Sequence, residues 1–109
     1  MSIIDNLETM RARGQDSALL RYSLGNEYLK QERLEEALAH LAEAVRMDAG
    51  YSAAWKLYGK ALATAGRHED AVGAFDHGIA TAERKGDVQA AKEMRVFRTR
   101  SQRALDAAS

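Results

Sequence analysis

The sequence has no cysteine among its 109 residues. This absence excludes disulfide bonds, a thiolate nucleophile and any zinc site that depends on cysteine. Proline is absent as well, and aromatic residues make up only 6% of the chain. Proline interrupts helices and aromatic residues favour strands, so a chain with no proline and few aromatic residues is predicted to be all-α.

Neither sign of charge dominates, since 16 Lys and Arg residues balance 16 Asp and Glu residues. A chain without net charge has no general attraction for nucleic acid or for an anionic membrane, so neither is expected as a partner. The N-terminal stretch lacks an apolar run of signal-peptide length, and nothing approaches the roughly 20 apolar residues of a membrane span. These features favour a cytoplasmic protein. The length of 109 residues favours a single domain over residues 1–109.

The chain contains one internal repeat. Six residues of the first copy match six residues of the second at a constant offset of 34 positions. The pairs are Ala18 with Ser52, Leu24 with Tyr58, Gly25 with Gly59, Tyr28 with Leu62, Ala37 with Ala71, and Leu41 with Phe75. Apolar residues recur three and four positions apart within each copy, which indicates amphipathic helices.

Each copy is predicted to be a pair of helices. Repeat one (18–50) is expected to contain helices at 18–31 and 34–47, and repeat two (52–85) helices at 52–65 and 69–85. Gly25 and Gly59 lie inside these helices, where glycine costs about 1 kcal/mol relative to alanine. We expect the second helix of each pair to approach these glycines too closely for a side chain.

Further helices are predicted on either side of the repeats. Ser2 can cap a short helix that has Ile3, Leu7 and Met10 on one face, so residues 1–16 form either a helix docked on repeat one or a frayed tail. Asp87 can cap a last helix over residues 87–106, with a narrow apolar stripe inside a basic surface. A helix of this kind seals the end of a repeat array.

The repeated positions resemble the tetratricopeptide repeat (TPR) family, whose pattern is W-x2-L-G-x2-Y in the first helix and A-x3-F in the second. The matching residues are Trp55, Tyr58, Gly59, Leu62, Ala71 and Phe75 in repeat two, and Arg21, Leu24, Gly25, Tyr28, Ala37 and Leu41 in repeat one. Arg21 departs from the family's Trp, and Gly78 stands where Ala usually packs. The resemblance, to small stand-alone bacterial TPR proteins in particular, implies a right-handed α–α superhelix of two hairpins.

The resemblance also implies a binding surface, because TPR proteins generally bind an extended or helical peptide in a concave groove formed by first helices. The groove-facing candidates in this chain are Tyr22, Asn26, Leu29, Lys30, Lys56 and Lys60. Lysines at these spacings also fit a plain solvated helix face. A clamp for a partner's C-terminal carboxylate is not expected, since Tyr22 and Leu57 replace a Lys and an Asn of that arrangement.

No group of residues meets the requirements of an active site, so we expect no enzyme and no cofactor. His40, His68 and His77 lack metal-ligand spacing and are expected at the surface. The leading hypothesis is a scaffold or adaptor, monomeric or weakly dimeric, that binds a peptide segment of a partner protein in the concave groove. The alternative is a structural or oligomerising subunit that self-associates or docks in a larger complex.

Overall fold

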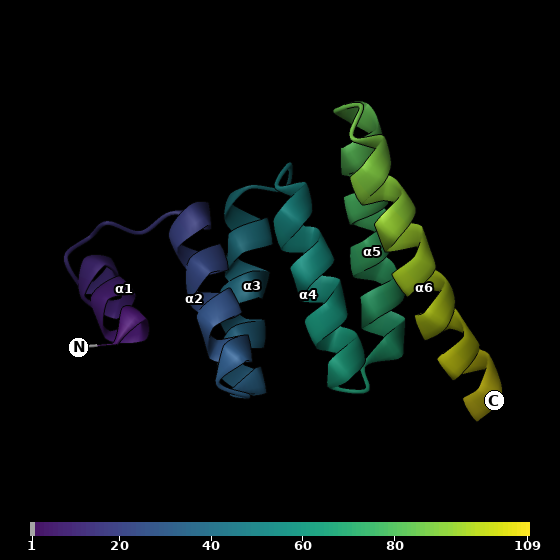
Figure 1. The fold of residues 1–109 in the computed structure, drawn as a ribbon, viewed down its shortest axis with the longest axis horizontal. Coiled ribbons are helices and arrows are strands. Elements are labelled where there is room, and N and C mark those ends of the chain that lie inside the picture. The colour runs from purple at the N-terminus through teal and green to yellow at the C-terminus, as the bar shows by residue number, and fades with distance from the viewer. Residues whose placement is uncertain (1) are drawn as a thin grey trace. The chain divides into compact units, whose positions relative to one another are not determined.

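The computed structural model describes residues 2–109, which form six helices and no strand (Figure 1). The helices are α1 (Ile3–Ala12), α2 (Ala18–Lys30), α3 (Leu34–Met47), α4 (Ser52–Thr64), α5 (His68–Arg84) and α6 (Val88–Ala108). The predicted all-α class is confirmed. The helices form two compact units, one that ends at Ala49 and one that runs from Gly50 to Ser109. That residues 1–109 act as a single domain stays a prediction.

The helix boundaries agree with the repeat pattern to within one residue from α2 to α5. The last helix is the exception, because α6 continues to Ala108, beyond the predicted end at residue 106. Neither Gly nor Pro interrupts this end of the chain. The side chain of Gln102 also donates a hydrogen bond to Asp106 one turn later, at 3.0 Å, which supports the last turn.

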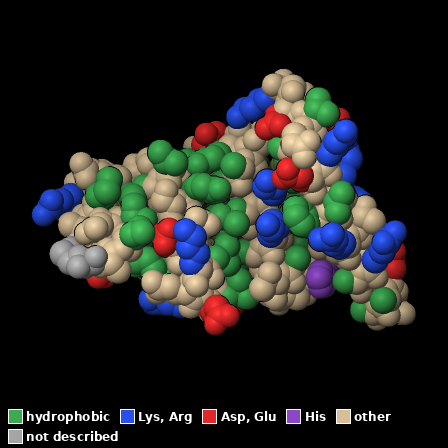
Figure 2. Space-filling model, in the orientation of Figure 1, with side chains coloured by type: hydrophobic (Ala, Val, Ile, Leu, Met, Phe, Trp, Pro, Cys, Tyr) green, Lys and Arg blue, Asp and Glu red, His purple; other side chains and the backbone are tan. Residues whose placement is uncertain are grey.

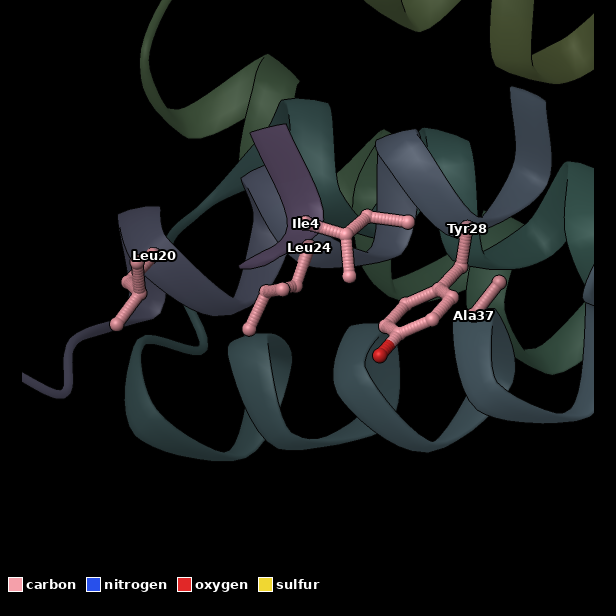
Figure 3. Packing of buried hydrophobic residues seen from close by; sticks show 5 residues of the cluster. All are labelled: Ile4, Leu20, Leu24, Tyr28 and Ala37. Carbon is pink, nitrogen blue, oxygen red and sulfur yellow. The ribbon is translucent and has the colours of Figure 1, made fainter. Parts of the chain in front are cut away.

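The first helix is capped at its start and docks on the first hairpin. The Ser2 hydroxyl accepts a hydrogen bond from the backbone N–H of Asp5 at 3.0 Å, and the Asp5 carboxylate accepts one from the backbone N–H of Ser2. Ile4 is buried among α2 and α3 residues, as Figure 3 shows; the cluster is Ile4, Leu20, Leu24, Tyr28 and Ala37. This packing makes α1 part of the first unit.

The face of α1 that docks differs from the predicted stripe of Ile3, Leu7 and Met10. Ile3 is 59% exposed and Met10 is 42% exposed, whereas Ile4 is only 7% exposed. The docked face passes through Ile4 and Leu7, three residues apart on the helix, and Leu7 packs against the buried cluster. The predicted docked face was therefore wrong by about a third of a helical turn. Ile3 and Ile4 are adjacent, and the sequence pattern does not indicate which of them is buried.

The glycines inside α2 and α4 are explained by close helix approach, as predicted. A Cβ atom on Gly25 would lie 2.5 Å from Cγ of Leu41 on α3. A Cβ atom on Gly59 would lie 2.5 Å from Cε1 of Phe75 on α5. Each hairpin therefore seats a large side chain of its second helix against bare backbone of its first helix.

The second unit contains a third helix, α6, which packs mainly on α5. Gly78 makes this packing possible, since a Cβ atom there would collide with the sulfur of Met94 on α6 and lie 2.9 Å from Cβ of Trp55. Met94 is fully buried. The departure from the Ala of the family pattern thus has a local reason, which is the space that Met94 occupies.

Candidate functional site

The six predicted groove residues lie on the first helix of each hairpin. Four belong to α2 in the first unit and two to α4 in the second unit. Lys30 and Lys60 are exposed, and the others are half-buried.

The predicted residues of α2 differ in the contacts that they already make within the first unit. Leu29 packs against the buried cluster of the first unit. Lys30 pairs with Glu27 on the same helix at 3.1 Å, with 63% of its side chain exposed. An exposed pair of this kind contributes little to stability and is easily exchanged for another partner. Asn26 is half-buried, and its side-chain amide forms no hydrogen bond within residues 2–109.

On α4, Lys56 is engaged with α6. Its Nζ donates a hydrogen bond to a carboxylate oxygen of Glu93 at 2.6 Å. The same carboxylate accepts a second hydrogen bond from Gln89, at 3.2 Å. These two hydrogen bonds, the one from Lys56 first, hold the pKa of Glu93 below its usual range. Lys56 thus links α4 to α6.

Lys60, one turn further along α4, lies over an aromatic ring. Its Nζ is 5.0 Å from the ring centroid of Phe97 on α6, and the guanidinium carbon of Arg100 is 5.5 Å from the same centroid. Phe97 in turn stacks on Phe75 of α5, with centroids 5.9 Å apart. Two cations and one aromatic ring from α4 and α6 therefore meet at one place.

A cavity of about 250 Å³ opens at this place. Its lining comes from all three helices of the second unit: Lys60, Ala63, Thr64, His68, Phe75, Phe97, Arg100 and Ser101. His68 Nδ1 lies 3.3 Å from the hydroxyl oxygen of the buried Ser101. The sequence predicted an apolar stripe on the last helix but gave no connection between Phe97 or Ser101 and Lys60. The available signal was the i, i+3, i+4 spacing of Phe97, Arg100 and Ser101 on one helix face.

His40 belongs to a second polar group, in the first unit, and is not the surface residue that the sequence predicted. Its ring stacks on Tyr28 with centroids 5.4 Å apart, and its Nδ1 is 3.3 Å from a guanidinium nitrogen of Arg21. Its Nε2 lies 3.8 Å from a carboxylate oxygen of Glu8 on α1. Burial lowers the pKa of His40, and Arg21 acts in the same direction, while Glu8 opposes them. The docked α1 explains this burial.

Arg21, which replaces the family's Trp, forms a double hydrogen bond with Asp16. Its Nε and Nη2 lie 2.8 Å from the two carboxylate oxygens. This contact holds the pKa of Asp16 below its usual range. In repeat two the corresponding residue, Trp55, is half-buried and stacks on His77 with centroids 4.8 Å apart.

The described part of the chain contains no group of three His, Asp or Glu side chains placed to hold a metal ion. Over the same residues, 2–109, every helix is too short or too polar to cross a membrane. In the first unit, α2 offers surface hydrogen-bonding groups and a cation, and in the second unit α4 and α6 offer cations beside a partly apolar cavity. These groups suit non-covalent recognition of another molecule.

Comparisons with known proteins agree with this description. A model of the tetratricopeptide repeat matches residues 22–82. The chain is 48% identical over 102 residues to the TPR repeat-containing protein PA0015 of Pseudomonas aeruginosa. The matched region covers 94% of this chain and 97% of that protein. It is similar to the solution structure of protein BPP2914 of Bordetella parapertussis, with 42% identity and a TM-score of 0.79; the similarity covers 94% of this chain and 90% of that structure. It is also similar to the crystal structure of a tetratricopeptide repeat domain protein of Salinibacter ruber, with 26% identity, a TM-score of 0.74, and coverage of 80% and 97%.

Proposed function

The chain therefore belongs to the tetratricopeptide repeat family, as its repeated pattern predicted, and we propose that it is a scaffold or adaptor that binds a peptide segment of a partner protein. TPR domains generally mediate protein–protein interaction and are generally not enzymes. We assign the binding contacts to the first helix of each hairpin, α2 in the first unit and α4 in the second unit. These contacts are the predicted residues: Tyr22, Asn26, Leu29, Lys30, Lys56 and Lys60.

The observation that supports this placement best is the side chain of Asn26, whose half-buried amide is still open to solvent. A half-buried amide that forms no hydrogen bond within residues 2–109 has its donors and acceptor available for a ligand. An extended peptide presents backbone N–H and C=O groups that pair with such an amide. Lys30, on the next turn of α2, is held only by an exposed ion pair and adds a movable cation.

A pull-down from lysate of the source organism tests the proposal. The test variant carries Asn26→Ala and Lys30→Glu on α2. The control variant carries Met47→Ala and Ala39→Glu, at exposed positions of α3. We expect the wild type and the control to capture the same partner and the test variant to lose it, with all three equally helical by circular dichroism. Retention of that partner by the test variant would contradict binding along α2.

A second candidate function, self-association or docking through the N-terminal helix, is favoured by exposed apolar residues of the first unit. Ile3, Met10 and Leu19 are 59%, 42% and 64% exposed. Met10 and Leu19 also line a shallow cavity of about 180 Å³ between α1 and α2. Hydrophobic side chains are visible over α1 to α3 on the face drawn in Figure 2. A surface of this composition is typical of a protein contact.

Light scattering after size exclusion discriminates between the two functions. If the first unit self-associates, the mass of the wild type rises with concentration and Leu19→Glu abolishes the rise. A constant monomer mass up to millimolar concentration would eliminate self-association and leave the peptide-binding function. Ala80→Glu, at an exposed position of α5, serves as the control for the added charge.

A further inference from the structure

The cavity between α4, α5 and α6 has an apolar floor. Phe97 forms it together with Ala63 and Phe75, and Phe75 itself is fully buried. The stacking of Phe97 on Phe75 fixes the orientation of the floor ring. An aliphatic side chain of a ligand would lose contact with water on this surface, which is favourable in proportion to the area covered.

Two cations stand at the rim of this floor, Lys60 and Arg100. Neither forms an ion pair with a carboxylate anywhere in residues 2–109. Their neighbours behave differently, since Lys56 pairs with Glu93, Arg95 with Glu83, and Arg98 with Asp76. Figure 2 shows Lys and Arg side chains beside hydrophobic ones over α4 and α6. Lys60 and Arg100 are thus cations beside the cavity that no carboxylate of residues 2–109 neutralises, whereas Lys56, Arg95 and Arg98 on the same helices are paired.

Lys60 influences the carboxyl group of Glu93. It lowers the pKa of this group, but the hydrogen bonds from Lys56 and Gln89 are the larger causes of that shift. The Glu93 carboxylate already accepts hydrogen bonds from Lys56 and Gln89. Lys60 and Arg100 therefore remain available to an external anion, and both lie over the ring of Phe97, 5.0 and 5.5 Å from its centroid.

We propose that this cavity binds an aliphatic residue together with an adjacent Asp or Glu of the partner's peptide segment. The aliphatic side chain lies on Phe97, and the carboxylate lies between Lys60 and Arg100. The proposal rests on the proposed function, because a segment that lies along the helices presents its interior residues, and hence a side-chain carboxylate, to the cavity. A bare phosphate would leave the apolar floor uncovered, which is why a carboxylate beside an apolar group is the better match.

Nuclear magnetic resonance titration of the full-length protein tests this assignment. The probe is an acetylated and amidated tetrapeptide, alanine–leucine–glutamate–alanine, and its counterpart has glutamine in place of glutamate. We expect the acidic peptide to shift the amide signals of residues 60–64 and 97–101 saturably and to bind about fivefold more tightly than the glutamine peptide. Equal binding of the two peptides, or no saturable shift at these residues, would overturn the proposal.

Two variants test whether the preference for the glutamate peptide arises at this cavity. Arg100→Gln removes one rim cation and is expected to abolish the preference for glutamate. Lys92→Gln removes an exposed cation elsewhere on α6 and is expected to retain it. A glutamine peptide with a free C-terminal carboxylate forms a third arm. If it binds better than the blocked acidic peptide, the site recognises a chain end, and the assignment to a side-chain carboxylate is wrong.

Failure of this inference is distinguishable from failure of the proposed function. If the partner captured from lysate is lost by the Asn26→Ala, Lys30→Glu variant but bound equally by wild type and Arg100→Gln, the scaffold function stands and the cavity assignment fails. If the Asn26→Ala, Lys30→Glu variant keeps the partner while the acidic tetrapeptide still binds at residues 97–101, the placement along α2 fails and the cavity assignment stands.

Discussion

The two hairpins share a packing scheme and differ in the chemistry that surrounds it. In both, a glycine of the first helix receives a large side chain of the second, Leu41 in the first unit and Phe75 in the second. Around this contact the first unit uses charged and polar groups, with Arg21 bound to Asp16 and next to His40. The second unit uses aromatic rings. The backbone contact is therefore the common requirement, and its surroundings are free to vary.

The largest expected effect tests that common contact. Phe75→Ala should cost about 3 to 5 kcal/mol of unfolding free energy, because it removes a fully buried ring that contacts α4 and α6. Phe75→Leu, which introduces the residue of the first hairpin, should cost about 1 to 2 kcal/mol. Urea unfolding followed by circular dichroism measures both. A loss below about 1 kcal/mol for Phe75→Ala would show that the ring is not part of the stabilising core.

Alanine substitutions at the two helix glycines should have smaller effects on stability, and these effects should differ between the hairpins. Gly59→Ala should cost about 1 to 3 kcal/mol, since its Cβ would meet three atoms of the Phe75 ring within 2.8 Å. Gly25→Ala should cost less, because Leu41 can change its rotamer while alanine improves helix propensity by about 1 kcal/mol. The same urea experiment compares them. If Gly25→Ala proves the more costly of the two, the assumed difference between a rigid ring and a flexible side chain is incorrect.

The turns between the helices of each hairpin give a third comparison. Glu32 has φ of 59°, in the region that favours glycine, and the matching residue of the second hairpin is Gly66, with φ of 78°. Glu32→Gly should raise stability by about 0.5 to 1 kcal/mol, while Gly66→Ala should lower it by about 1 kcal/mol. Thermal unfolding resolves changes of this size in a domain of about 100 residues. A stabilising Gly66→Ala would contradict this interpretation of the turn.

The smallest expected effect concerns pH. Because burial places the folded-state pKa of His40 below the unfolded value, the unfolded chain binds more protons as pH falls through about 6.5, and stability is lost. His40→Gln should therefore flatten the decline in stability between about pH 7.5 and pH 5. Ala39→Gln, at an exposed position of α3, is the control for the introduced glutamine and should keep the wild-type decline. Equal slopes for wild type and His40→Gln would contradict the lowered pKa of His40.

The sequence predicted most of the helices and the reason for their glycines, because both depend on spacing within one or two turns. It misjudged the docked face of α1, where two adjacent isoleucines fit two different faces. It also gave no sign that Lys56 pairs with Glu93, or that Lys60 lies over Phe97, because both contacts join α4 to α6 across 37 positions of the chain. A helical pattern identifies which side of a helix is apolar, but not which residue of a distant helix lies opposite.

Gly78 has a consequence for the modular use of this fold. Capping helices are attractive parts for engineered repeat arrays, because they close an exposed end. The α6 helix requires a glycine on the helix beneath it, since Met94 fills the space of a missing side chain. If α6 were attached to a repeat with alanine at that position, the sulfur of Met94 would collide with the alanine methyl group. A transferable cap therefore consists of α6 together with the glycine that receives it.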